Sequence, residues 1–122
     1  MNRKNIAILG ATGHIAKSLI YQWLQDKEHN LYLFARDTDK VNKFLLNLND
    51  NNEKLVSIKQ FTEFEFYDYD VIINCVGIAD PAKIKNEHIM LFRLTETIDN
   101  QILDYLKNNQ KCLYINMSSI WN

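Results

Sequence analysis

Near its start the chain holds a short apolar segment, a pair of glycines and an amphipathic segment, in that order. Residues 5–9 form an almost continuous apolar run, Gly10 and Gly13 follow, and a helical pattern begins directly afterwards. This order predicts a buried strand that turns sharply into a helix. The first amides of a helix have no partner within it, and the helix dipole adds partial positive charge at the same end. We therefore expect the turn to bind an anion, for which the pyrophosphate of a dinucleotide is the usual candidate.

Each small residue of the turn has its own expected role. Gly10 supplies backbone angles that other residues rarely adopt, Gly13 lets a phosphate approach the main chain, and Ala16 lets the helix lie close to the sheet. The imidazole of His14 is expected to be solvated or to pack, without a chemical role. The residues expected to contact the cofactor here are Gly10, Ala11, Thr12, Gly13, His14 and Ile15.

Length, charge and cysteine content narrow the class of protein. A chain of 122 residues predicts one domain with its own core. The net charge of -1 and the scattered Lys and Arg argue against nucleic-acid binding, which needs clustered basic residues. No apolar run approaches the roughly 20 residues that span a bilayer, so we expect no membrane contact and a cytoplasmic location. Cys75 and Cys112 lie in different expected strands, with no histidine at ligand spacing, which predicts reduced core thiols and no metal site.

Short apolar runs alternate with amphipathic segments along the whole chain, which is typical of strand–helix units in a parallel sheet. We expect helices after the glycine turn, after Thr38 as N-cap and after Pro81, and only a turn or two over 61–69. The strands are expected at 5–9, 31–35, 55–58, 71–76 and 111–117. Right-handed crossovers then give an α/β fold of the Rossmann type: a doubly wound parallel sheet of five strands in the order 3-2-1-4-5, within three αβα layers.

This strand order places the first and fourth strands beside the point where the sheet order reverses. The carboxyl ends of both strands are then expected to face one crevice, where ligands of such sheets bind. The fourth strand brings four further candidate cofactor contacts to the crevice: Asn74, Cys75, Val76 and Gly77.

Three segments resemble the N-terminal part of short-chain dehydrogenases/reductases, nearer the extended or atypical branches that include nucleotide-sugar epimerases/dehydratases and NADPH reductases. They are the glycine turn at 10–16, with Ala16 in place of the family's last glycine, the fourth-strand segment at 70–77 and the end of the fifth strand at 114–119. Together they span nearly the whole chain in the right order. The resemblance implies NAD(P) binding.

The residue after the second strand bears on the choice of cofactor. Arg36 lies about 20 residues past the glycine turn, where the adenosine ribose is recognised in this fold. A guanidinium pairs well with a 2′-phosphate, so Arg36 favours NADP. Asp37 would accept hydrogen bonds from a free 2′-hydroxyl and keeps NAD as the alternative. The other interpretation is that the two are an exposed charged pair that caps the next helix.

The resemblance also implies a catalytic serine after the fifth strand. Ser119, with Ser118 as second choice, occupies that position, although two small polar residues there are also ordinary in a loop. In the family a tyrosine followed four residues later by a lysine moves the proton, and this sequence contains no Tyr-x-x-x-Lys. We therefore expect cofactor binding without turnover.

Three hypotheses about function follow. The first is an NAD(P)-binding domain, truncated before its catalytic tyrosine, whose full-length parent is an oxidoreductase or nucleotide-sugar epimerase/dehydratase acting on an unknown small molecule. An open sheet edge at the fifth strand would then be covered by a continuation or in a homo-oligomer. The second is a complete, non-catalytic module that senses the dinucleotide and acts through a protein partner. The third is an interaction domain without a ligand.

Overall fold

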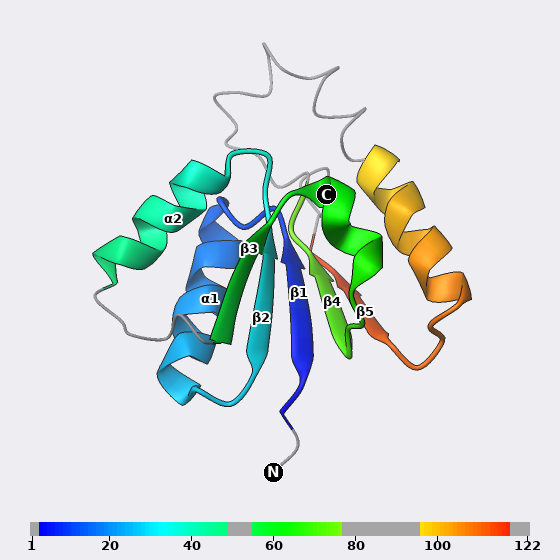
Figure 1. Cartoon of the computed structure of the whole chain (residues 1–122), viewed down its shortest axis with the longest axis horizontal. Coiled ribbons are helices and arrows are strands. Elements are labelled where there is room, and N and C mark those ends of the chain that lie inside the picture. The colour runs from blue at the N-terminus through cyan, green and yellow to red at the C-terminus, as the bar shows by residue number, and fades with distance from the viewer. Residues whose placement is uncertain (1–2, 49–54, 77–95, 118–122) are drawn as a thin grey trace.

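The computed structural model describes residues 3–48, 55–76 and 96–117 (Figure 1). Its centre is one parallel sheet in the order β3-β2-β1-β4-β5, which confirms the predicted order. Main-chain pairing runs from β1 outward on both sides, so β1 is the central strand. The strands are β1 (Asn5–Leu9), β2 (Asn30–Phe34), β3 (Val56–Lys59), β4 (Val71–Asn74) and β5 (Leu113–Asn116).

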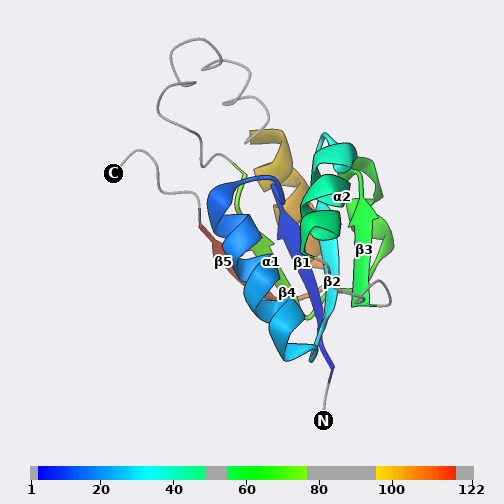
Figure 2. The same cartoon turned by 90° about the vertical axis from the view of Figure 1, so that its left-hand side faces the viewer.

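Helices lie on both faces of the sheet, as predicted (Figures 1 and 2). One face is covered by α1 (His14–Asp26) and α2 (Thr38–Asn47), and the other by the short 3-10 helix η2 (Phe61–Phe66) and the helical residues 96–107. Successive side chains of β1 point to opposite faces of the sheet, so this strand contributes residues to both cores. Ile6 and Ile8 pack toward α1, whereas Ala7 and Leu9 pack toward η2 and residues 96–107.

The two cores differ in composition. The α1 side is aliphatic and holds Ala16, Ile20 and Leu24 of that helix, all buried. The opposite side is rich in aromatic rings, and Phe64, Tyr69 and Tyr105 lie 5.1 to 5.3 Å apart between ring centres. Two hydrogen bonds hold this cluster. Tyr69 donates its hydroxyl to the Phe64 carbonyl at 2.6 Å, and the Tyr69 amide donates to the Tyr105 hydroxyl at 2.9 Å.

Several expected details differ in the structure. Asp37, not Thr38, is the N-cap of α2, because its carboxylate accepts the amides of Asp39 and Lys40. The apolar spacing after the glycine turn predicts that Ile15 is buried with Ala16 and Ile20, but 38% of Ile15 is exposed. Cys112 is only partly buried, while Cys75 is a buried thiol, and both are free.

The strands are also shorter or shifted. β2 begins one residue before the expected position and β3 one residue after it, and β5 spans four residues where seven were expected. Strand β4 ends at Asn74, and the Asn74 side chain accepts the amide of Val76, two residues later, at 2.9 Å. The start of the expected long helix and Gly77 lie outside the described residues.

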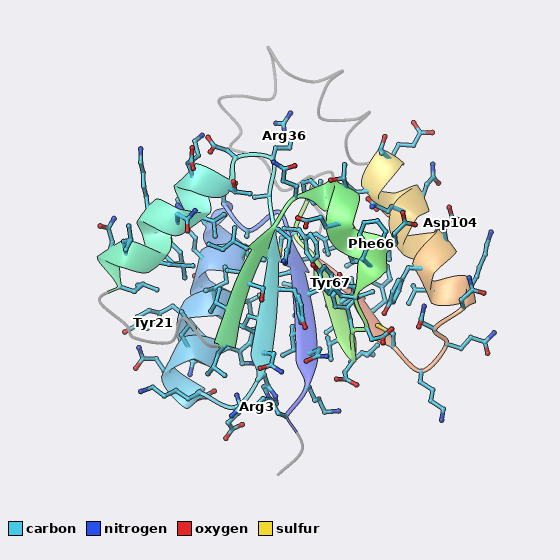
Figure 3. The ribbon with its side chains drawn as sticks, in the orientation of Figure 1. Arg3, Tyr21, Arg36, Phe66, Tyr67 and Asp104 are labelled. Carbon is cyan, nitrogen blue, oxygen red and sulfur yellow. The ribbon has the colours of Figure 1, made fainter. Side chains whose placement is uncertain are left out.

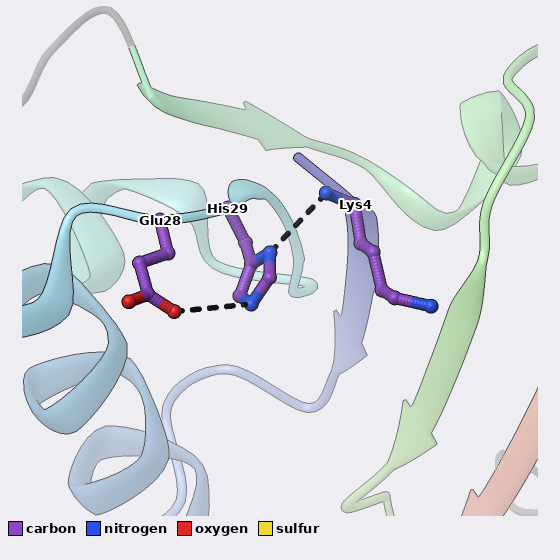
Figure 4. A network of polar contacts seen from close by, with 3 residues as sticks. All are labelled: Lys4, Glu28 and His29. Atoms are coloured by element: carbon purple, nitrogen blue, oxygen red, sulfur yellow. Dashed lines mark hydrogen bonds and ion pairs between the residues drawn. The ribbon is translucent and has the colours of Figure 1, made fainter. Parts of the chain in front are cut away.

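The amino ends of β1 and β2 are joined by polar contacts at the end of the sheet opposite the glycine turn (Figure 4). The Lys4 amide donates to His29 Nδ1 at 3.2 Å, and His29 Nε2 lies 3.9 Å from the Glu28 carboxylate. Asn30 Nδ2 donates to Asn5 Oδ1 at 2.9 Å. In the described part of the chain, none of the helices is both long and apolar enough to cross a membrane.

Candidate functional site

The turn after β1 requires glycine at its first position for two independent reasons. Gly10 has a φ of 79°, in the left-handed region that side chains with a Cβ rarely adopt. A Cβ on Gly10 would also lie 3.0 Å from the Cys75 carbonyl carbon and 3.0 Å from the Val76 nitrogen. The first glycine of the turn therefore lies directly against the peptide that follows β4.

The second glycine, Gly13, has ordinary extended angles, with φ -76° and ψ 162°. A Cβ there would meet nothing closer than the Gly10 carbonyl oxygen at 3.7 Å. The fold therefore does not need glycine at this position. Its missing side chain instead leaves space beside the start of α1, which is what a bound phosphate would require.

Main-chain hydrogen bonds attach the turn to β2. The amides of Gly10 and Ala11 both donate to the Phe34 carbonyl, at 2.9 and 3.1 Å, and Gly13 donates to Gly10 at 3.2 Å. Ala11 is fully buried, whereas Thr12 is partly exposed and His14 is exposed. Of the turn residues, Thr12, Gly13 and the first residues of α1 therefore remain accessible for a ligand.

In the described part of the chain, neither a capping side chain nor an acidic residue of the first turn offsets the positive polarity at the start of α1. Its first hydrogen bond runs from the Lys17 amide to the Gly13 carbonyl at 2.9 Å, so the amides of the three residues before Lys17 have no acceptor within the helix. The N-cap residue Gly13 offers no side chain, and the first turn holds no acidic residue. These amides and the helix dipole together favour an anion at this point.

Strand register brings the loops after β1, β2 and β4 together at the carboxyl end of the sheet. Leu9 pairs with Phe34 on one side and with Asn74 on the other, so Gly10, Ala35 and Cys75 follow at the same level. Arg36 is exposed at this end and extends away from the end of β2 (Figure 3). Among residues 3–48, 55–76 and 96–117, its guanidinium forms no ion pair.

Asp37, the residue after Arg36, caps the N-terminus of α2. Its Oδ1 accepts the amides of Asp39 at 3.1 Å and Lys40 at 3.3 Å, which starts α2. The interpretation of this residue as a helix cap is therefore confirmed.

The side chains after β4 belong to the core and not to the crevice. Cys75 and Val76 are each 4% exposed, in the α1-side core and the aromatic core respectively. Burial raises the pKa of the Cys75 thiol to about 11, which keeps it protonated and unreactive near neutral pH. Of the four cofactor contacts expected from this segment, Asn74, Cys75 and Val76 can offer mainly their backbone.

Asn74 has partners that the sequence did not reveal. It is fully buried, and its Nδ2 donates to Asp99 Oδ1 at 3.1 Å and to the Tyr114 hydroxyl at 3.2 Å. One signal in the sequence could have indicated these partners: Asn74 is a polar side chain within an apolar strand. A buried side-chain amide of this kind must find hydrogen-bond partners. The candidate catalytic residues Ser118 and Ser119 lie outside the described residues.

Solved structures with a similar fold include a reductase di-domain, a lactate dehydrogenase and a 6-phospho-alpha-glucosidase. A thiolation-reductase di-domain from an archaeal non-ribosomal peptide synthetase has a TM-score of 0.72 at 15% identity, covering 95% of this chain and 35% of that one. Lactate dehydrogenase from Eimeria maxima with NADH and oxamate has a TM-score of 0.61 at 17% identity, covering 94% and 36%. A 6-phospho-alpha-glucosidase from gut microorganisms, in complex with NAD and Mn2+, has a TM-score of 0.65 at 15% identity, covering 94% and 33%.

The chain thus spans about a third of the length of these structures, and the likeness shows a shared Rossmann fold. A family model described as NADP oxidoreductase, coenzyme F420-dependent, matches residues 5–89, which include the glycine turn, Arg36 and the end of β4. The chain belongs to this family of NADP oxidoreductases and is an NAD(P)-binding Rossmann domain.

Proposed function

We propose that this chain is the cofactor-binding part of an oxidoreductase and that it prefers NADP to NAD. The observation that carries the proposal is the arrangement at the carboxyl ends of the strands. There Gly10 lies against the Cys75–Val76 peptide, α1 begins without a side-chain cap, and Arg36 follows β2. The open space at Gly13 and the amides beside it suit a pyrophosphate. The residues present therefore fit a dinucleotide.

Each of these residues has a proposed task in binding. The amides at the start of α1 hold the pyrophosphate, and Gly13 lets it approach the backbone. Arg36 pairs with the 2′-phosphate of NADP, while Asp37 is engaged as the cap of α2, which leaves less acceptor capacity for the free 2′-hydroxyl of NAD. The bound dinucleotide supplies the two-electron oxidation or reduction of a substrate, and this chain orients it.

The proposed subtype is a short-chain dehydrogenase/reductase of the extended or atypical kind, supported by the segments 10–16, 70–77 and 114–119. In a longer parent protein acting in the cytoplasm, Ser119 or Ser118 would hold the oxygen of a small-molecule substrate. Because the 122-residue sequence has no Tyr-x-x-x-Lys, we propose that it binds cofactor without turnover by itself.

The β5 edge supports a contact with further protein. Leu113 and Ile115 are 57% and 37% exposed, and they pair in register with Val71 and Ile73 of β4, on the face that α1 covers nearer the centre. An edge strand with exposed apolar side chains favours association. We propose that a second copy or another part of the parent protein covers it.

The test of cofactor preference is an Arg36→Ala variant, with the dissociation constants of NADPH and NADH measured by nicotinamide fluorescence. Loss of a charge-assisted pair to the 2′-phosphate should weaken NADPH by about 10- to 100-fold and change NADH by about twofold or less. Arg3→Ala is the matched control, because it removes the same charge from the amino end of the sheet (Figure 3). It should leave both constants unchanged.

Two results would contradict the proposal. If Arg36→Ala weakened NADPH and NADH equally, Arg36 would not read the 2′-phosphate, and the preference for NADP would fail. If the wild-type chain bound neither dinucleotide at millimolar concentration, the cofactor-binding role itself would fail.

A further inference from the structure

The carboxamide of Asn74 joins three elements at the floor of the proposed cofactor crevice. It lies at the end of β4 and is fully buried. Its Nδ2 donates to Asp99 of the helical residues 96–107 and to Tyr114 of β5, at 3.1 and 3.2 Å. Its Oδ1 accepts the Val76 amide at 2.9 Å. Both amide protons are thereby used, and the oxygen serves the main chain of the loop.

These partners permit only one orientation of the amide. If the group were turned over, its oxygen would face the Asp99 carboxylate and its NH2 would face the Val76 amide, so both contacts would be repulsive. Asp99 therefore decides where Oδ1 points, Tyr114 adds a second acceptor for the NH2 group, and Oδ1 decides where the Val76 amide lies.

The peptide held in this way is the one against Gly10. A Cβ on Gly10 would come within 3.0 Å of Cys75 and Val76 main-chain atoms, so the Cys75–Val76 peptide and the glycine turn lie too close for a side chain between them. The position of that peptide therefore bears on the position of the turn, and the first amides of α1 follow the turn.

We propose that Asn74 is a positioning residue of the dinucleotide site, acting through the Cys75–Val76 peptide on Gly10, and that Asp99 and Tyr114 hold it in its working orientation. The inference rests on the proposed function, because the site it positions is the proposed cofactor crevice. Asn74 touches no ligand in this scheme. Its effect on binding is transmitted by the main chain.

The test compares NADPH affinity with stability in variants of the full 122-residue chain. Asn74→Asp keeps the shape and the acceptor for Val76 but places a carboxylate against Asp99. It should raise the NADPH dissociation constant by about tenfold at pH 7.5, since like charges at hydrogen-bond distance repel. Asn74→Asp combined with Asp99→Asn restores one amide and one carboxylate, and should return the constant to within about threefold of wild type.

Asn100→Asp is the control for added negative charge, because it lies on the same helical stretch, is exposed, and takes no part in the hydrogen bonds of Asn74. It should bind NADPH as wild type does. Urea unfolding of every variant separates a general loss of stability from a specific loss of affinity. If Asn74→Asp does not fold, Tyr114→Phe decides: weaker NADPH binding at unchanged stability supports the positioning role, and unchanged binding overturns it.

Other outcomes are equally decisive. Wild-type affinity in folded Asn74→Asp, or no recovery in the double variant, would overturn the inference and leave the proposed function standing. Equal losses in Asn74→Asp and Asn100→Asp would assign the effect to net charge and overturn it as well. Absence of NADPH and NADH binding by the wild-type chain would overturn the proposed function, and the inference with it.

Discussion

The two glycines of the first turn serve different physical needs, although the sequence presents them as a pair. Gly10 is needed by the fold itself, since both its positive φ and the close Cys75–Val76 backbone exclude a side chain. Gly13 has ordinary angles and open surroundings, so the fold does not require glycine there, and its proposed role is to let a phosphate approach the backbone.

Alanine substitutions separate these two roles. Gly10→Ala should lower the free energy of unfolding by about 2 to 3 kcal/mol, from backbone strain and the contact with the Cys75–Val76 peptide. Gly13→Ala should cost about 1 kcal/mol or less, yet weaken NADPH binding about tenfold or more because its methyl group narrows the approach to the amides. Urea unfolding and fluorescence titration measure the two effects. Equal effects of both substitutions on stability would contradict the distinction.

The sequence could identify the candidate turn and could place Asn74 near it, at the end of the fourth strand. It could not identify the side chains that surround the Asn74 carboxamide. A strand followed by closely spaced glycines is a local pattern, so the residues that make it are adjacent in the sequence. The two side-chain partners of Asn74 are 25 and 40 residues away, on a helix and an edge strand. Only the assembled fold brings Asp99 and Tyr114 to it, which is why a residue expected to contact the cofactor has a side chain that is fully engaged within the protein.

At the level of elements, hydrophobic periodicity predicted the existence and order of the helices and strands better than their ends. The start of α2 is the clearest case, because Asp37 and Thr38 are adjacent and both are good capping residues. The backbone decides between them: Asp37 has extended angles, with φ -104° and ψ 90°, while Thr38 is already helical. These angles depend on the direction in which the chain leaves β2, so the local sequence does not predict them.

The cap gives a prediction for the α2 element. Asp37→Ala should destabilise the protein by about 1 kcal/mol, because two amides lose their acceptor. Thr38→Ala is the matched control at the next position and should change stability by less than about 0.5 kcal/mol. Urea unfolding of the two variants distinguishes them. A larger loss for Thr38→Ala would restore Thr38 as the cap and contradict the structure.

In the molecule as a whole, the two faces of the sheet respond differently to pH. The α1-side core is aliphatic apart from the Cys75 thiol, whereas the opposite core buries the phenols of Tyr69 and Tyr105, and burial raises the pKa of all three above the ordinary value. A buried neutral phenol stabilises the fold fully below the pKa of the unfolded chain, which is about 10. As pH rises above that value, the unfolded state loses protons first, so stability falls until the folded pKa is reached.

The stability to urea should therefore be level between about pH 7 and 8, begin to fall near pH 9 because of the buried Cys75 thiol, and fall more steeply above about pH 10, by up to about 1.4 kcal/mol per pH unit for each buried group. Tyr69→Phe should be less stable at pH 7, because it loses the hydrogen bond to the Phe64 carbonyl, but its alkaline slope should be shallower. Tyr21→Phe, at an exposed position on α1, should leave the slope as in wild type. An unchanged slope in Tyr69→Phe would contradict this account.

The hydrogen bond between the Lys4 amide and His29 has a practical consequence for the design of fusion proteins with this domain. The first strand enters at the edge of the sheet farthest from the glycine turn, and its start is fastened to that of β2 (Figures 1 and 4). A reporter or purification tag joined ahead of Asn5 would thus sit one strand length, about 16 Å, from the nucleotide end. Such a fusion offers a firm attachment point for surface immobilisation or an optical sensor, with the glycine turn left at the opposite end of the strand.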